Sequence, residues 1–235
     1  MHALLLAAGR GERMRPLTDN VAKPLLAVGG RRLIEWQIEA LVRADILDLV
    51  INTAHLAEQI ETNLGDGSRY GARIRYSREG TRSEDALETL GGIVKALPQL
   101  GAAPFLVASS DIVTDFDYGQ LRAAAAAIEG GQFDAHLVLV ENPPYHPLGD
   151  MGLATGPAAG PAQGIATRTA PLYTYANIGV LAPRLLSGLA ADRAPLFPWL
   201  FGAVEGGRVS AQLWRGRWWN VGTPQDLAAV DKICR

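Results

Sequence analysis

The sequence predicts an α/β protein, a Rossmann-like three-layer αβα sandwich around a mixed, mainly parallel β-sheet. Short apolar runs alternate with amphipathic helical periods through the first half of the chain, as in proteins whose strands are joined by helices. Such connections are right-handed and cover both faces of a sheet, so ligands are expected beyond the carboxyl ends of the strands. The 235 residues, of which 48% are hydrophobic, are expected to form a single domain over residues 1–235.

The first strand is expected over residues 3–8, and a loop with two glycines, Gly9 and Gly11, follows it directly. Glycines after a buried strand let backbone N–H groups close around phosphate oxygens. Four cations fall between positions 10 and 23, namely Arg10, Arg13, Arg15 and Lys23, and only Glu12 and Asp19 are interspersed among them. This composition indicates a strongly anionic ligand. The alternative is a mobile loop whose charge is incidental.

Two better-known glycine loops do not fit this stretch. A Walker A loop ends in Gly-Lys-Ser/Thr, which is missing, and a dinucleotide fingerprint opens a helix at once. Here Pro16 and Pro24 prevent an early long helix, and the first clear helical period falls at residues 33–42. A dinucleotide-dependent oxidoreductase is therefore disfavoured.

Later elements follow from apolar periodicity and from turn residues. Helices are expected over 32–44, 55–64, 118–128 and 225–233, and strands over 47–52, 73–76, 104–111, 135–140 and 172–181. Residues 77–85 are expected to form an exposed loop, and residues 152–164 a hairpin-rich or poorly ordered excursion. Residues 88–92 precede a further helix, for which Thr89 is either the N-cap or a ligand contact. Thr223 and Pro224 are expected as N-cap and first residue of the last helix.

Asp111 is the strongest candidate for a metal ligand. It ends an apolar strand, so its carboxylate is aimed at the expected ligand edge of the sheet. Magnesium takes oxygen ligands and keeps waters and substrate phosphates in its octahedron. The alternative role for Asp111 is that of a turn or helix-cap residue.

The composition excludes several classes of partner. A net charge of −2 gives no global basic field for nucleic acid. The single cysteine, Cys234, excludes an intrachain disulfide framework and suits a reducing cytoplasm. Because no apolar run approaches the roughly 18 residues of a membrane span, no membrane partner is expected.

Residues 6–18, together with Lys23-Pro24-Leu25-Leu26, resemble the signature of the sugar-1-phosphate nucleotidylyltransferases. The resemblance implies the nucleotide-diphospho-sugar transferase fold, a nucleoside triphosphate and a sugar 1-phosphate as substrates, and Mg²⁺ as cofactor. It also implies a nucleotide-binding half at about 1–115 and a sugar-binding half at about 116–235. A monomer and a homodimer both remain open.

The resemblance also implies roles for individual residues. It assigns catalysis to Arg13 and Lys23, and metal binding to Asp111 and to Asn220, which stands where the family has aspartate or asparagine. The implied nucleotide-binding residues are Leu6, Ala7, Ala8, Gly9, Gly11, Arg13, Lys23, Thr89 and Gly91. The implied sugar-binding residues are Glu88, Gly149, Asp150 and Asn177.

Within the family, the chain most resembles the N-acetylmuramate α-1-phosphate uridylyltransferases of peptidoglycan recycling. The shared features beyond the signature are residues 65–71, residues 87–89, and Asn142-Pro143, His146-Pro147 and Gly149-Asp150. An insert at residues 81–85 and the uncharged Asn220 depart from the pattern. A mannose-1-phosphate guanylyltransferase, a glucose-1-phosphate uridylyl- or thymidylyltransferase, and a non-catalytic nucleotide-binding regulatory subunit remain as alternatives.

Overall fold

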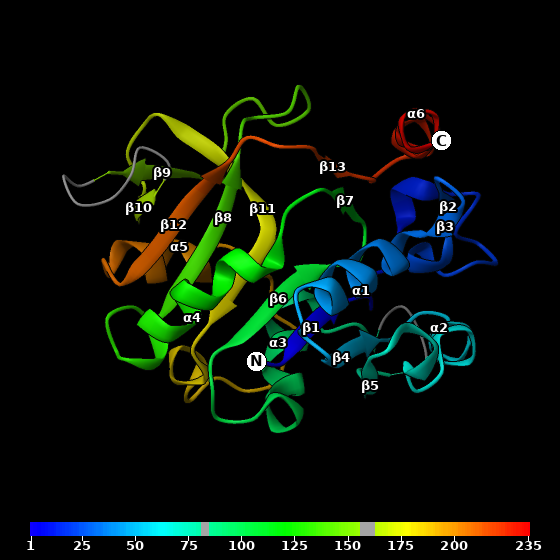
Figure 1. The fold of residues 1–235 in the computed structure, drawn as a ribbon, viewed down its shortest axis with the longest axis horizontal. Helices are drawn as coiled ribbons and strands as arrows, with labels where there is room; N and C mark the ends of the chain where they lie inside the picture. Colours follow the sequence, from blue (N-terminus) through cyan, green and yellow to red (C-terminus); the bar gives the residue numbers. More distant parts are fainter. Residues whose placement is uncertain (81–84, 156–162) are drawn as a thin grey trace.

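A nine-stranded sheet runs through the computed structural model, which describes residues 1–80, 85–155 and 163–235 (Figure 1). The strands, in order across the sheet, are β5 (Arg73–Arg78), β4 (Asp48–Thr53), β1 (Ala3–Leu6), β6 (Phe105–Ser109), β11 (Leu172–Leu181), β8 (Ala135–Val140), β12 (Val209–Trp214), β10 (Gln163–Thr167) and β9 (Met151–Ala154). In the described part of the chain, seven of these nine run in one direction, and β11 and β10 run in the other. The mixed, mainly parallel sheet is confirmed.

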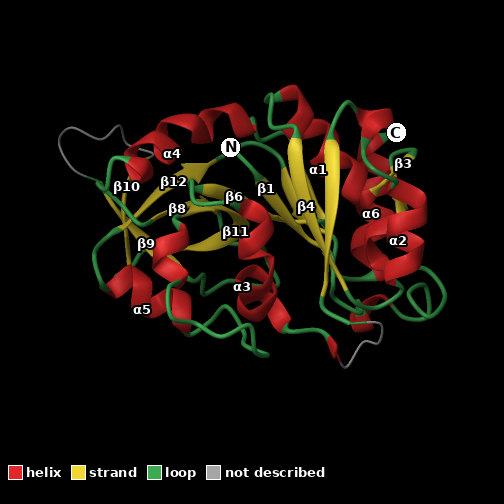
Figure 2. Ribbon diagram, turned by 90° about the horizontal axis from the view of Figure 1, so that it is seen from below, coloured by secondary structure: helices red, strands yellow, loops and turns green. Residues whose placement is uncertain are grey.

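Helices cover both faces of this sheet, which gives the three layers (Figure 2). One face packs against α1 (Leu33–Arg43), α2 (Ala57–Leu64) and α4 (Leu121–Glu129), and the other against α3 (Glu88–Leu100) and α5 (Trp199–Glu205). Side chains alternate between the two cores along each strand: Ala3 and Leu5 of β1 enter the first core, and Leu4 enters the second. Burying each of these leucines contributes about 1.5–3 kcal/mol, which makes this strand a rigid base for the loop after it.

The loop after β1 contains only short 3₁₀ turns, η1 (Glu12–Met14) and η2 (Lys23–Leu25). This confirms that the prolines prevent an early helix. Further 3₁₀ turns are η3 (Ser68–Tyr70), η5 (Tyr118–Gln120) and η6 (Pro183–Leu186). Within the described ranges, every helix is too short or too polar to cross a bilayer.

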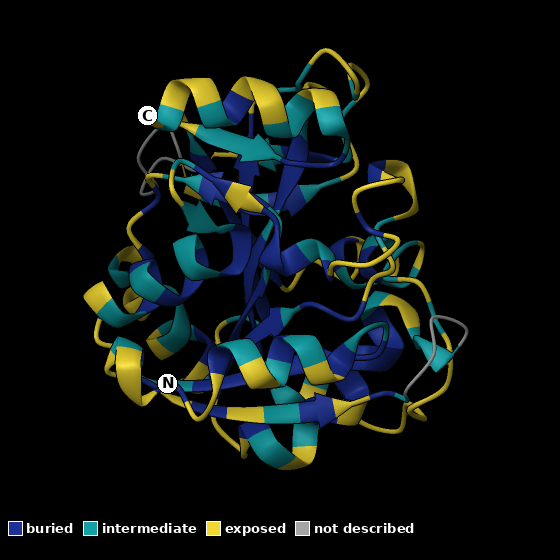
Figure 3. Cartoon of the chain, turned by 90° about the vertical axis from the view of Figure 1, so that its right-hand side faces the viewer, coloured by how far each residue is buried: buried dark blue, intermediate teal, exposed yellow. Residues whose placement is uncertain are grey.

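Two small two-stranded sheets accompany the main one, and the second of them joins distant parts of the chain. β2 (Ala27–Val28) pairs with β3 (Arg31–Arg32), and β7 (Ile112–Thr114) pairs with β13 (Trp218–Asn220). The last helix, α6 (Pro224–Cys234), packs beside β2, and Figure 3 shows its outer side exposed over a buried interior. Thr223 is its N-cap, with Oγ1 accepting from the Asp226 N–H at 3.2 Å, as predicted.

Several predicted boundaries differ from the structure. α3 begins at Glu88, so residues 88–92 form its first turn, and Leu87 rather than Thr89 is the N-cap. β5 extends to Arg78, and Glu79 beyond it is 8% exposed, so the exposed loop predicted for 77–85 is wrong at its start. Residues 81–84 of the predicted insert and 156–162 of the predicted excursion lie outside the described residues.

Candidate active site

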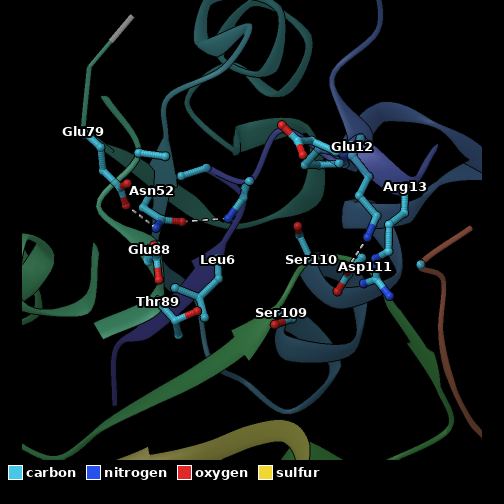
Figure 4. Close-up of a pocket in the computed structure, with 18 residues that line it drawn as sticks. Leu6, Glu12, Arg13, Asn52, Glu79, Glu88, Thr89, Ser109, Ser110 and Asp111 are labelled. Atoms are coloured by element: carbon cyan, nitrogen blue, oxygen red, sulfur yellow. Dashed lines mark hydrogen bonds and ion pairs between the residues drawn. The ribbon is translucent and has the colours of Figure 1, made fainter. Parts of the chain in front are cut away.

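A cavity of about 490 Å³ opens at the carboxyl ends of the four neighbouring parallel strands β5, β4, β1 and β6. It is lined by Leu6, Ala7, Ala8, Gly9, Gly11, Glu12, Arg13, Lys23, Pro24, Asn52, Glu79, Ala86, Glu88, Thr89, Ser109, Ser110, Asp111 and Gly222. Figure 4 shows Arg13 and Asp111 at one end of this cavity and Asn52 and Glu79 at the other. The cavity therefore has a cationic end and a separate polar end.

The turn at Gly11 shapes the cationic end. Gly11 has φ +67°, a left-handed conformation that side chains disfavour, and a Cβ there would lie 3.1 Å from Cβ of Lys23. The Gly11 carbonyl accepts hydrogen bonds from the Met14 N–H at 2.9 Å and from Thr18 Oγ1 at 2.8 Å. These bonds fold the loop back on itself, so that Arg13 and Lys23 reach the same cavity.

The four cations of the loop divide into two kinds. Arg10 and Arg15 pair with acids of the loop itself, at 3.5 Å from Glu12 and 2.6 Å from Asp19. Lys23 Nζ instead contacts Asp111 Oδ2, and these two side chains are 11% and 23% exposed. Among the described residues, Arg13 has no acidic partner.

The Arg13 guanidinium lies against Gly222, where a Cβ would come within 3.3 Å of Nη2. Its charge is thus held at the cavity without being neutralised, which suits an anionic ligand.

Asp111 and Asn220 are brought together by the pairing of β7 with β13. Asn220 lies opposite Ile112 in this pairing, and the Val221 N–H donates to the Asp111 carbonyl at 2.9 Å. Asn220 Oδ1 is buried and has no hydrogen-bond partner among the described residues. Because buried oxygens are normally paired, this unpartnered amide oxygen, on the strand that pairs with the one after Asp111, suits a cation ligand.

The described residues contain no cluster of three or more acidic, histidine or cysteine side chains that could hold a metal ion alone. Magnesium does not need such a cluster, because it is commonly bound by one or two protein oxygens together with waters and substrate phosphates. The donor set of Asp111 and Asn220 fits that ion.

The polar end of the cavity was not predicted from the sequence. Asn52 Oδ1 accepts from the Ala7 N–H at 2.7 Å, and its Nδ2 donates to Glu79 Oε1 at 2.6 Å. Glu79 Oε2 accepts from the Leu87 N–H at 2.7 Å, and burial raises the pKa of this carboxyl. The chain of bonds ties the start of the glycine loop to the start of α3. Its signal in the sequence was an acid directly after a strand, at the same edge as Asp111.

A second cavity, of about 330 Å³, shares Arg13 with the first. Its lining residues are Arg13, Tyr145, His146, Asp150, Thr174, Tyr175, Asn177, Phe197, Trp218 and Asn220. Asn177 has φ +55° within an irregularity of β11 between Tyr175 and Gly179, so its backbone is strained at the cavity wall. Two cavities meeting at one arginine match a two-substrate site.

Most of the predicted site residues line one of the two cavities, and two of them do not. Of the nucleotide-binding candidates, Leu6, Ala7, Ala8, Gly9, Gly11, Arg13, Lys23 and Thr89 line the first cavity. Gly91 does not, because it packs α3 against a distant segment, where a Cβ would lie 2.1 Å from the Asp192 carbonyl oxygen. Of the sugar-binding candidates, Asp150 and Asn177 line the second cavity, and Gly149 packs behind it against Asn142.

Glu88 lines the first cavity instead, with φ +59° and a 3.0 Å bond from Arg193 Nε. Glu88 thus belongs to the wall of the first cavity, and a strained backbone again lies at a cavity.

Comparison with known proteins gives matches to one kind of enzyme. Residues 2–153 match the family model described as nucleotidyl transferase. The chain is 44% identical to the N-acetylmuramate alpha-1-phosphate uridylyltransferase of Neisseria meningitidis, over 95% of this chain and 94% of that protein. It is 32% identical to the Caulobacter vibrioides protein of the same name, over 97% and 95% of the two chains.

A Bacillus anthracis structure described as a glucose-1-phosphate thymidylyltransferase superposes with a TM-score of 0.81. The alignment covers 100% of this chain and 96% of that one at 18% identity. The likeness confirms the predicted α/β fold.

Proposed function

Because the chain belongs to the nucleotidyl transferase family, we propose that it transfers uridylyl from UTP to N-acetylmuramate α-1-phosphate. The products are UDP-N-acetylmuramate and pyrophosphate. Support comes from the two relatives of that name, which match this chain at 44% and 32% identity over nearly their full lengths. The reaction would serve peptidoglycan recycling in the cytoplasm.

The observation that carries the proposal is Arg13, which borders both cavities. The nucleotide occupies the first cavity, with its triphosphate at the end formed by Arg13 and Lys23 and its nucleoside toward Asn52. The sugar occupies the second cavity. This arrangement sets the sugar phosphate against the α-phosphorus at the junction, where the two reactants meet without a protein nucleophile.

The phosphate oxygen of the sugar 1-phosphate attacks the α-phosphorus in line, and the bond to pyrophosphate breaks. Arg13 and Lys23 meet the charge that develops on the transferring group and on the leaving pyrophosphate. Because Arg13 is already held at the cavity without an acidic partner among the described residues, its charge needs little reorganisation during the reaction. Losing one such charge costs about 10²–10³ in rate.

Magnesium would be held by Asp111 and Asn220. When bound, it would supply charge neutralisation for the phosphates that complete its coordination. The amide of Asn220 brings an oxygen without a negative charge, so the free protein holds the ion more weakly than a pair of carboxylates would. Lys23 contacts Asp111 in the free protein, so the carboxylate that would hold the ion also keeps this cation at the cavity.

The test is release of pyrophosphate with Mg²⁺, measured for UTP, dTTP, GTP and CTP against the 1-phosphates of N-acetylmuramate, N-acetylglucosamine, glucose and mannose. Asp111→Ala is the control, and it should release none. Turnover with GTP and mannose 1-phosphate, or with glucose 1-phosphate and UTP or dTTP, would establish the alternative transferases. If the protein binds nucleotide but releases no pyrophosphate with any pair of nucleotide and sugar 1-phosphate, it is a regulatory subunit.

A further inference from the structure

We propose that His146, oriented by Asp150, forms a carboxylate-binding subsite in the second cavity. The subsite would bind the lactyl carboxylate of N-acetylmuramate, and this inference rests on the proposed function. It assigns a purpose to the residues around 142–150, which the transfer chemistry itself does not use.

The loop that carries His146 is firmly attached to β11. Asn142 Nδ2 donates to the Leu172 carbonyl at 2.9 Å, and its Oδ1 accepts from Thr174 Oγ1 at 2.9 Å. At the other end of the loop, the Asp150 N–H donates to the Tyr173 carbonyl at 2.8 Å. A loop tied at both ends to a central strand can hold a side chain in fixed position at the cavity.

Both carboxylate oxygens of Asp150 have partners within the protein. Oδ2 accepts from the Tyr175 N–H at 2.8 Å, and Oδ1 lies 3.0 Å from His146 Nε2. The Asp150 side chain is only 16% exposed, whereas that of His146 is 39% exposed and lines the cavity. Asp150 therefore orients the imidazole and is a positioning residue for it.

The second ring nitrogen of His146 is left for a ligand. Among the described residues, Nδ1 has no hydrogen-bond partner, while Nε2 faces a carboxylate. An imidazole that donates from both nitrogens carries a positive charge, and a charged donor binds a carboxylate more strongly than a neutral one does.

Charge in the second cavity points to the same ligand. Its cationic or potentially cationic lining residues, in the part of the chain that the structure describes, are Arg13 and His146. Arg13 is shared with the phosphate site, so His146 remains for a second anion on the sugar. N-acetylmuramate 1-phosphate differs from N-acetylglucosamine 1-phosphate by a lactyl ether, whose carboxylate supplies that anion.

The experiment compares His146→Asn with the wild type on these two sugar phosphates, with UTP as the nucleotide. The ratio of kcat/KM, N-acetylmuramate over N-acetylglucosamine, should fall about 10- to 100-fold, as expected for loss of a hydrogen bond to a charged carboxylate. Calorimetric binding of UDP-N-acetylmuramate and UDP-N-acetylglucosamine should show the same loss of preference. Asp150→Asn should lower the ratio too. His2→Asn serves as the matched control, because His2 precedes β1 at its amino end and lines neither cavity.

A loss of folding or of general activity would lower kcat/KM for both sugar phosphates together and leave their ratio unchanged. If the wild type and His146→Asn both use N-acetylmuramate 1-phosphate and have the same ratio, the proposed subsite is wrong and the proposed function still stands. No turnover of N-acetylmuramate 1-phosphate by the wild type would instead overturn the proposed function.

Discussion

Replacing Lys23 by methionine should affect magnesium binding and catalysis in opposite directions. In the free protein Lys23 Nζ contacts Asp111 Oδ2, so a cation that binds Asp111 must first displace this contact. The side chains are 11% and 23% exposed, which leaves the pair only partly screened by water. A charge-assisted hydrogen bond contributes about 1.5–3 kcal/mol, and the partial exposure of Asp111 favours the lower end.

Lys23→Met should therefore bind Mg²⁺ about tenfold more tightly in the absence of nucleotide, because about 1.5 kcal/mol of competition is removed. It should also unfold at a temperature about 3–6 °C lower, since Asp111 loses its partner. The value of kcat should fall about 10²–10³-fold, because the phosphates lose a cation. Calorimetric titration, thermal melting and pyrophosphate release measure the three effects.

The matched control is Lys232→Met on α6, an exposed lysine far from the cavity that should leave all three quantities unchanged. Weaker Mg²⁺ binding in Lys23→Met would mean that Lys23 does not compete for Asp111. An unaltered kcat would refute the role of Lys23 at the phosphates.

Three further changes test other parts of the account. Gly11→Ala should raise the KM for UTP and lower stability by about 1–2 kcal/mol, because alanine is strained at φ +67°; normal UTP kinetics would count against the loop geometry. Leu5→Ala, at a position that is 0% exposed, should cost about 2–5 kcal/mol in urea unfolding, and a cost below 1 kcal/mol would place Leu5 outside the core. Burial lowers the pKa of His136 below 6.5, so below that pH the unfolded chain takes up a proton that the folded chain resists. Stability should therefore fall as the pH drops below about 6.5, and His136→Gln should flatten this dependence; an equal slope in both proteins would contradict it.

Features set by short-range chemistry were predictable from the sequence. A continuous apolar run that includes Leu4 and Leu5 predicted the buried strand, and Thr223 followed by Pro224 predicted the start of α6. The first turn of the glycine loop followed from Gly11. Each of these depends on residues within a few positions of one another, where backbone sterics and capping decide the outcome.

Features set by distant partners were not predictable in the same way. β13 pairs with β7 across more than a hundred residues, and only this pairing explains why Asn220 lies beside Asp111. Gly91 was expected at the nucleotide because of its position near Thr89, but its close contact is the carbonyl of Asp192. The burial of Glu79 likewise depends on its bonds to Asn52 and Leu87, which periodicity does not reveal.

The most direct test of the central claim is a competition in a single reaction. The protein is mixed with Mg²⁺, equal amounts of UTP, dTTP, GTP and CTP, and equal amounts of the 1-phosphates of N-acetylmuramate, N-acetylglucosamine, glucose and mannose. Mass spectrometry then identifies the nucleotide sugar that forms first. We expect UDP-N-acetylmuramate as the main product; another nucleotide sugar in its place, or none, would contradict the proposed function.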